Sequence, residues 1–520
     1  MTRKVSPDGR GTVERQPSAS SLAGRVTLRL GGWVLEAAAI ATLALVVLAS
    51  LLRPVVPWDS WAYHLPFSAW LWDIGDARRT FILGEQLSAR YAGFPLFAEF
   101  LQGALWKASG SMAASTLVNS ASLCALVAAA GIVIRGSLPI MAFGSLSIPL
   151  VAFHSTSNYI DLFVAVMICL QVLAAWQLER QARQAHPAPM RRTLGGWSGI
   201  FILAAAAAGN SKFQALVVSM AVSSFLALYL ISNRAQLVRG VLPRLALVLA
   251  LASVLSLATA ARNTVAFGNP FYPVRISLPA LGVTLPGTEV EYVSHPNYAE
   301  SLGAMSRPIY WVLSVTEIDW QVRQVPASYN IDANAGDQAR RFGPGRTGGT
   351  WGPFIACCCS LLLWLSMLAF RRNPAGFQAG VFILLLFIFL TVLTAFMPQS
   401  HEIRYYLYWP ILLLLVICIF AEAARLSTAT RLGLSLAFAL AFLWSQKMLD
   451  FSLRALPAQP TAELAMVHSP EIEFARRTGG VCLGPSYSPM QFAYAAVFHG
   501  GRYVIEQGWE GCSRHPPYPR

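Results

Sequence analysis

The sequence predicts an all-α polytopic membrane protein with about eleven transmembrane helices. Hydrophobic residues make up 55% of the 520 residues, charged residues only 12%, and the mean hydropathy is +0.51. A soluble chain of this length would need far more charge on its surface. The apolar residues gather into separate runs, most of them near the roughly 20 residues that a helix needs to cross a bilayer. The loops between the runs alternate between arginine-rich loops and loops that contain acids.

The apolar runs give the candidate spans. They are residues 31–52, 113–134, 137–156, 158–177, 197–209, 213–231, 244–261, 351–370, 375–397, 405–423 and 432–446. The run 197–209 is short and needs its flanks to cross a bilayer. The segment 91–109 is interrupted by Glu99. We interpret it as an interfacial or re-entrant helix rather than as another span.

The distribution of charge supports this count and predicts the orientation. Lys and Arg stay on the cytoplasmic side of membrane proteins, so the formal charge of +14 does not indicate a nucleic-acid partner. With a cytoplasmic N-terminus, short arginine-rich loops such as Arg371-Arg372 face the cytoplasm, and they hold almost no acids. The long loop 262–350, in which acids balance the basic residues, falls outside. Counting 91–109 as a span would move the arginines of 178–196 outside, which breaks the rule.

The chain therefore divides into three predicted parts. We expect a cytoplasmic tail at 1–30, a transmembrane domain at 31–446 with external loops at 53–112 and 262–350, and an external segment at 447–520. The tail lacks an A-x-A cleavage site, and the apolar run after it is long enough to span, so this run is interpreted as a signal anchor. The predicted location is the inner (plasma) membrane, with the C-terminus on the external, periplasmic side.

The C-terminal segment has a mixed α/β pattern. A helix is expected near Thr461–Arg477, and short strands around Gly480–Leu483 and Arg502–Glu506. A segment of this size has a thin core. Cys482 and Cys512 both lie in it, and outside the cytoplasm they could form a disulfide.

Asp59 is the most informative residue. It follows the first span in Trp58-Asp59-Ser60-Trp61-Ala62-Tyr63-His64-Leu65-Pro66. An acid at the mouth of a span is costly and by default marks a pathway, a binding site or a catalytic site. The alternative is a solvated loop aspartate. Tyr63–Trp72 is expected to form a short amphipathic helix along the interface, and Tyr63, His64 and Glu85 of this loop are candidate substrate-binding residues.

A second acid and three cations are predicted to lie on the same side of the membrane. Asp161 begins an otherwise apolar span, where a helix-start acid favoured by the macrodipole is the alternative reading. Lys212, Arg262 and Arg404 stand at three external turns. Each suits a phosphate oxygen, although single basic residues at an interface are also common anchors. Tyr272, in a rigid turn between Pro270 and Pro273, is a fourth candidate for substrate binding.

Several of these segments together resemble a known family. The segments are Asp59 with Trp61-Ala62-Tyr63-His64-Leu65-Pro66, Gly93-Phe94-Pro95-Leu96, Asn158-Tyr159-Ile160-Asp161, Gly209-Asn210-Ser211-Lys212, Gly268-Asn269-Pro270-Phe271-Tyr272-Pro273 and Arg404-Tyr405. Their order resembles that of GT-C type glycosyltransferases, in the bacterial dolichyl-phosphate-mannose mannosyltransferase-like and aminoarabinose-transferase-like branches. The resemblance covers roughly residues 30 to 446.

The resemblance implies a polyprenyl-phosphate sugar donor, an acceptor on the external face and inversion at the anomeric carbon. Asp59 corresponds to the acid that acts as base or orients the acceptor, and Asp161 to the acid of the second loop. Lys212 and Arg262 correspond loosely to phosphate ligands. Ser60 follows Asp59, so the doubled acidic motif of the family is missing; no metal ligands are assigned, and a divalent metal stays possible.

The acids and cations fit glycosyl transfer better than two other functions. Glycosyl transfer needs a base near the acceptor hydroxyl and charge stabilisation on the leaving phosphate, which fits external acids and cations on a lipid-linked substrate. A transporter or flippase would place charges near mid-span, often in two related halves, and the sequence has neither. A non-catalytic subunit for surface polysaccharide or lipid assembly stays open.

Overall fold

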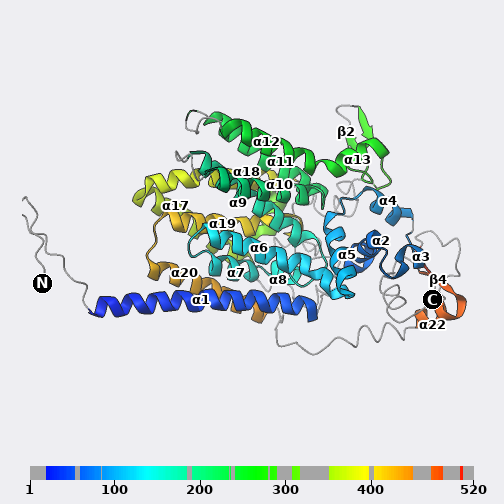
Figure 1. The fold of residues 1–520 in the computed structure, drawn as a ribbon, viewed down its shortest axis with the longest axis horizontal. Helices are drawn as coiled ribbons and strands as arrows, with labels where there is room; N and C mark the ends of the chain where they lie inside the picture. Colours follow the sequence, from blue (N-terminus) through cyan, green and yellow to red (C-terminus); the bar gives the residue numbers. More distant parts are fainter. Residues whose placement is uncertain are drawn as a thin grey trace, which may run out of the picture.

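A computed structural model describes residues 19–52, 59–83, 85–183, 190–233, 235, 241–278, 282–289, 307–316, 351–397, 403–448, 470–483 and 504–507. The chain is mostly helical and forms a polytopic bundle (Figure 1). The long helices of the bundle are α1 (Ala19–Leu52), α6 (Leu117–Val133), α9 (Asp161–Arg183), α10 (Met190–Gly209), α11 (Phe213–Ser232), α12 (Val241–Ser256), α17 (Trp351–Arg372), α18 (Pro374–Phe396), α19 (Tyr408–Ala423) and α20 (Thr428–Met448).

Two helices form the centre of the bundle. In their most apolar stretches, 89% of the residues of α9 and 94% of those of α19 are buried inside the protein, against 17% for α1. Helix α1 runs along one side next to α20 (Figure 1), and its exposed Trp33 and Val34 are suited to contact lipid. The central position of α9 and α19 matters because each begins near a candidate site residue.

Most of the eleven predicted spans are long apolar helices. Among the described residues, eight helices have the length and apolar character to cross a membrane, or nine if α12 and α13 (Ala258–Phe267), bent by 45°, count as one. Two predicted runs are shorter apolar helices, namely α7 (Leu138–Ser147) and the Gly195–Gly209 part of α10. Every predicted run is nevertheless helical.

The predicted span 137–156 is broken into two helices, α7 and α8 (Pro149–His154). Ile148 between them is extended, with φ −79° and ψ 112°. Pro149 explains the break, because proline disfavours helical geometry in the residue before it and has no N–H to donate to the preceding turn. Both helices are buried, so the break lies inside protein rather than in lipid.

The first loop folds into short helices at one end of the bundle (Figure 1). They are η1 (Ser60–His64, a π-helical turn), α2 (Leu65–Trp72), η2 (Ile74–Asp76), α3 (Ala77–Thr80), α4 (Glu85–Gly93), α5 (Phe97–Ser109) and η3 (Met112–Thr116). Helix α2 is not the amphipathic surface helix that the sequence predicted, because Leu65 to Ala69 are all buried. Helix α5 has 13 residues, about 20 Å, which is too short to span.

The C-terminal segment pairs with this loop. Strand β5 (Val504–Gln507) lies between β4 (Gly480–Leu483) and β1 (Phe81–Ile82) in a parallel sheet of order β1-β5-β4. Helix α22 (Pro470–Thr478) precedes β4 and overlaps the predicted helix; residues 461–469 are outside the described part. A small cluster that includes Leu83, Leu87, Ala475 and Val481 packs the two segments together.

The remaining elements lie after α13 and before α19. A two-stranded antiparallel sheet joins β2 (Ile276–Leu278) to β3 (Val283–Leu285). Helix α15 (Arg307–Thr316) packs on α18 and α17, and the short turn η8 (Ile403–Tyr406) leads into α19.

The close packing of α2 against α5 gives a test. A Cβ at Gly103 would lie 2.5 Å from the carbonyl oxygen of Ser68 and closer still to Trp72. We expect Gly103→Ala to destabilise the protein by about 1–3 kcal/mol, because the helices must move apart. Thermal denaturation in detergent measures this. The control is Gly32→Ala in α1, where a Cβ meets nothing within 4 Å and stability should stay equal or rise slightly. Equal melting temperatures for both variants would contradict the packing.

Candidate active site

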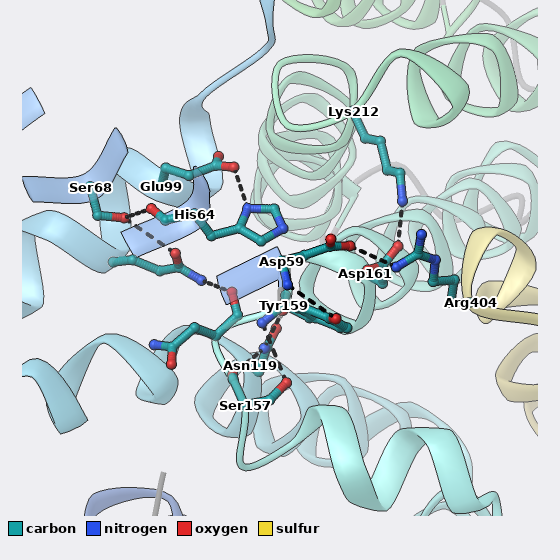
Figure 2. Close-up of polar contacts among 12 residues, drawn as sticks. Asp59, His64, Ser68, Glu99, Asn119, Ser157, Tyr159, Asp161, Lys212 and Arg404 are labelled. Atoms are coloured by element: carbon teal, nitrogen blue, oxygen red, sulfur yellow. Dashed lines mark hydrogen bonds and ion pairs between the residues drawn. The ribbon is translucent and has the colours of Figure 1, made fainter. Parts of the chain in front are cut away.

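Two acid–base ion pairs lie side by side at the end of the bundle that carries the first loop (Figure 2). Arg404 Nη1 donates to Asp59 Oδ2 at 2.8 Å, and the two side chains are 8% and 11% exposed. Lys212 Nζ donates to Asp161 Oδ1, with side chains 18% and 6% exposed. Four residues from four distant parts of the chain thus meet in one cluster.

Aromatic rings frame the two cations. Lys212 Nζ lies 4.2 Å from the centre of the Tyr405 ring, and the Arg404 guanidinium carbon lies 4.8 Å from it. Arg404 Nη2 also donates to the Tyr405 hydroxyl at 2.9 Å. The Tyr159 ring lies 6.0 Å from the guanidinium, and its hydroxyl accepts the Asp59 backbone N–H at 3.4 Å. Such cation–π contacts strengthen when water is excluded, so the rings help to hold positive charge at a buried site.

The turn before α9 sets the positions of Tyr159 and Asp161. Asn119 of α6 donates its amide to the carbonyls of Ser157, at 2.8 Å, and Tyr159. Its oxygen accepts the N–H of Phe163 at 3.0 Å. The Asn119 side chain therefore pairs two backbone carbonyls of the turn before α9 and one backbone N–H at the start of α9.

The segment before α11 sets the position of Lys212. Gly209 allows close approach of α10 and α12, since a Cβ there would lie 2.8 Å from the Ser256 carbonyl oxygen. Asn210 donates to the carbonyl of Leu255 at 2.7 Å and accepts the N–H of Thr259 at 2.9 Å. It thereby satisfies the backbone groups that the bend between α12 and α13 leaves without helical partners. Lys212 itself is the extended residue that precedes α11.

A recess opens beside the ion pairs. Its polar part is formed by Asp161, Lys212, Arg404 and Tyr405, and its apolar part by residues of α9, α11 and α19. The apolar part includes Val164, Ile168, Ala215, Leu407 and Tyr408. The recess has room for about one water molecule, so a larger anionic ligand enters only if the ion pairs move apart.

Two other predicted residues lie next to the cluster. Tyr63 and His64 belong to η1, directly after Asp59, and their ring centres are 4.2 Å apart. Burial, together with the charge of Asp59, raises the pKa of the Tyr63 phenol well above its usual value. Tyr63 therefore stays a neutral hydrogen-bond donor at physiological pH. His64 Nδ1 lies 2.8 Å from Glu99 Oε1.

Arg262 and Tyr272, by contrast, belong to a contact between the first loop and the segment that follows α13. Arg262 hydrogen-bonds to Asn263 and to the Gly93 carbonyl, rather than to either ion pair. Asn263 donates to the Gly93 carbonyl at 2.7 Å and also to that of Tyr272 at 3.2 Å. The Tyr272 ring stacks on Phe267 with centres 4.0 Å apart. The glycine and proline motifs around these residues are explained by this contact between loops.

Arg90 adds an ion pair to the same contact between the first loop and the segment after α13. Glu85 lies apart from the cluster of ion pairs. Arg90 Nε donates to Glu289 Oε1 at 2.5 Å. Burial lowers the pKa of Arg90, but the hydrogen bond and charge of Glu289 outweigh burial, so that pKa is raised above its usual value. Glu85 begins α4 with an exposed side chain, which is typical of a helix-start acid.

Some residues of the site were missed at the sequence level. Tyr159 and Tyr405 stood inside two quoted motifs, and their proximity to Asp161 and Arg404 was the available signal. Glu99 was noticed only because it interrupts an apolar run. Asn119 carried no signal, because nothing in its own helix distinguishes it.

The last two predictions concern a metal site and a disulfide. Within the described ranges, no three His, Cys, Asp or Glu side chains are grouped so that they could hold a metal ion. Cys512 and the side chain of Cys482 lie outside the described part of the chain, so their disulfide stays a prediction.

Comparison with known proteins finds a distant likeness in structure alone. No family model and no curated protein matches the chain. The structure is similar to two crystal structures of ArnT from Cupriavidus metallidurans, one in the apo state and one bound to undecaprenyl phosphate. Identity is 14% in both, the TM-scores are 0.39 and 0.38, and the matches cover 91% of this chain and 89% and 90% of the ArnT chains. At this distance the likeness assigns no role to any residue.

The Asp59–Arg404 pair gives a test by a double-mutant cycle. We expect Arg404→Gln to destabilise the protein by roughly 3–5 kcal/mol, because it leaves a buried carboxylate without its cation. The double variant Asp59→Asn/Arg404→Gln should regain much of the loss, since no buried charge is then uncompensated. Thermal denaturation in detergent gives the four stabilities. Losses that simply add would show that the two residues do not interact.

Proposed function

We propose that this protein is a membrane glycosyltransferase that moves a sugar from a polyprenyl-phosphate donor to an acceptor on the non-cytoplasmic face. The observation that supports it most is the buried cluster in which Lys212 and Arg404 share the Tyr405 ring and stand beside the carboxylates of Asp161 and Asp59. Two adjacent cations suit a substrate that carries a phosphate group. The order of motifs, which resembles GT-C glycosyltransferases, supports the same class.

Lys212 and Arg404 would bind the donor phosphate. Both are already paired with carboxylates, so the phosphate must share them or replace Asp161 and Asp59 as their partner. Arg404 presents a planar fork that suits two phosphate oxygens, and Lys212 acts as a compact point charge. When the sugar leaves, the phosphodiester becomes a monoester and its negative charge grows. Fixed cations near the leaving group stabilise this growing charge in the transition state.

Asp59 would act as general base on the acceptor hydroxyl. Its Oδ2 accepts from Arg404, and its other oxygen can take the proton. The acceptor oxygen then bonds to the anomeric carbon, the bond from that carbon to the phosphate oxygen breaks, and the phosphate keeps the electron pair. A single displacement of this kind inverts the anomeric carbon. Asp161 contributes through Lys212, which it positions.

The proposal also places the ion pairs on the non-cytoplasmic side of the membrane. Arginine-rich loops at the opposite ends of the helices, such as Arg371-Arg372 at the end of α17, favour a cytoplasmic location for those ends. The first loop and the ion pairs then face outward. The acceptor would be an envelope glycan, lipid or protein.

Sugar transfer in proteoliposomes tests the proposal. Wild-type protein should transfer label from a polyprenyl-phosphate sugar to extracted envelope acceptors. Asp59→Asn should lower the rate by about 10²–10⁴-fold, the usual contribution of a general base. The matched control is Asp76→Asn, an exposed acid of the same loop that pairs with Arg79, and it should transfer at the wild-type rate. Equal rates for all three proteins would remove Asp59 from the mechanism. No transfer by wild type with any donor would contradict the enzyme and favour a flippase or a non-catalytic subunit.

Binding of polyprenyl phosphate tests the role of Lys212. Asp161→Asn leaves Lys212 without its competing carboxylate, so this variant should bind polyprenyl phosphate at least as tightly as wild type. Asp161→Asn/Lys212→Met removes the cation without leaving an unpaired acid. It should bind roughly 10- to 100-fold more weakly, the equivalent of about 1.5–3 kcal/mol for a charged hydrogen bond. Titration in detergent followed by tryptophan fluorescence measures both. Lys107→Met, at an exposed lysine of α5, is the control. Equal affinity for the two Asp161 variants would exclude Lys212 as a phosphate ligand.

A further inference from the structure

His64 and Glu99 form a buried pair next to the two ion pairs. His64 Nδ1 and Glu99 Oε1 are 2.8 Å apart, and each side chain is 3% exposed. His64 ends the π-helical turn η1, and Glu99 lies in the first turn of α5. An acid in the middle of a hydrophobic segment is expensive to bury, so its partner and its place need an explanation.

The π-helical turn brings His64 round to the Asp59 side. The Leu65 N–H bonds to the Ser60 carbonyl, five residues back, instead of four as in an α-helix. This wider turn directs residues five apart, such as Asp59 and His64, to similar sides of the helix. π-turns of this kind are frequently found at functional sites. In Figure 2 the ring nitrogen of His64 that is remote from Glu99 faces the Asp59 side of the site.

Neighbouring contacts fix Glu99 opposite His64. Gln102, one turn further along α5, donates to the Asn158 carbonyl at 2.7 Å and accepts the Ser68 hydroxyl at 3.3 Å. The absence of a side chain at Gly103 lets α5 lie directly on α2. Helix α5 is therefore tied to α2 and to the turn that carries Tyr159, and its acid has a fixed position.

The pair has the properties of a proton acceptor. An ionised carboxylate only accepts hydrogen bonds, so Glu99 selects the His64 tautomer with hydrogen on Nδ1 and a free electron pair on Nε2. Glu99 Oε2 is buried with no hydrogen-bond partner among the described residues. The pair then carries one buried negative charge, and a proton on Nε2 would convert it into a neutral pair of opposite charges.

We propose that the His64–Glu99 pair takes up the proton that Asp59 removes from the acceptor hydroxyl. The inference rests on the proposed function, because it names the next carrier in the same reaction. The proton passes from the acceptor oxygen to Asp59 as the new glycosidic bond forms. It then passes to Nε2 of His64, which restores the Asp59 carboxylate and its pairing with Arg404. Release of the proton from His64 to solvent completes the turnover, and Glu99 is a positioning residue that holds the tautomer.

Chemical rescue of His64→Ala in the proteoliposome transfer assay tests this role. We expect His64→Ala to lower kcat by about 10²-fold or more, with little change in KM for the donor. Added imidazole should raise that rate several-fold by filling the vacated space with a proton acceptor. Glu99→Gln should also lower kcat, and imidazole should not rescue it because its histidine is still present.

Three controls separate this role from structural effects. Imidazole should leave wild type and Asp59→Asn unchanged. His154→Ala, which removes another buried histidine that neighbours Tyr159 with ring centres 5.1 Å apart, should gain nothing from imidazole, so rescue there would mean that imidazole merely fills cavities. His64→Gln, which keeps a hydrogen-bonding group for Glu99, should fold with a melting temperature near that of wild type and still have the low kcat.

The outcomes distinguish this inference from the proposed function. Transfer by wild type and by His64→Ala at the same rate would overturn the proton role and leave the glycosyltransferase intact. Loss of transfer without rescue by imidazole, in a folded variant, would likewise overturn it. Absence of transfer by wild type would overturn both.

Discussion

The ion pair between Asp59 and Arg404 joins the first loop to the turn before α19, across 345 residues of sequence. Both side chains are nearly buried, and a buried charge is tolerated only when it is compensated and hydrogen-bonded. The position of η1 therefore depends on the position of η8. Because α19 is the most buried of the described long helices, the first loop is attached directly to the core of the bundle.

The second ion pair, Asp161 with Lys212, likewise fixes the start of α9 relative to the start of α11. Tyr159 and Tyr405 lie between or beside the pairs, so the four charges form one cluster rather than two separate bridges. Such a cluster can hold cations in place without a ligand and still offer them to an anion. A substrate that carries its own negative charge would meet a preorganised site.

The sequence predicted the class of protein, the helical runs and four of the charged residues that meet. These features follow from local patterns, because length, hydrophobicity and turn residues act within each segment. The pairing of Asp59 with Arg404 could not be predicted, since nothing local indicates which acid faces which cation. Arg262 illustrates the limit: it resembles Arg404 in its place at the end of a span, but Asn263 and the Gly93 carbonyl hold it in a contact between loops. The bend after Ser256 could not be predicted either, because it depends on Asn210, which compensates the lost helical bonds from another helix.

The parallel sheet β1-β5-β4 has a consequence for biosynthesis. Its first strand is made early, whereas β5, which lies between the other two, is more than 400 residues later in the chain. Translation at about 5–20 residues per second separates the two by tens of seconds. During that interval the first loop lacks both Arg404 and its β-strand partner. The charged end of the bundle can therefore be completed only after nearly the whole chain has been made.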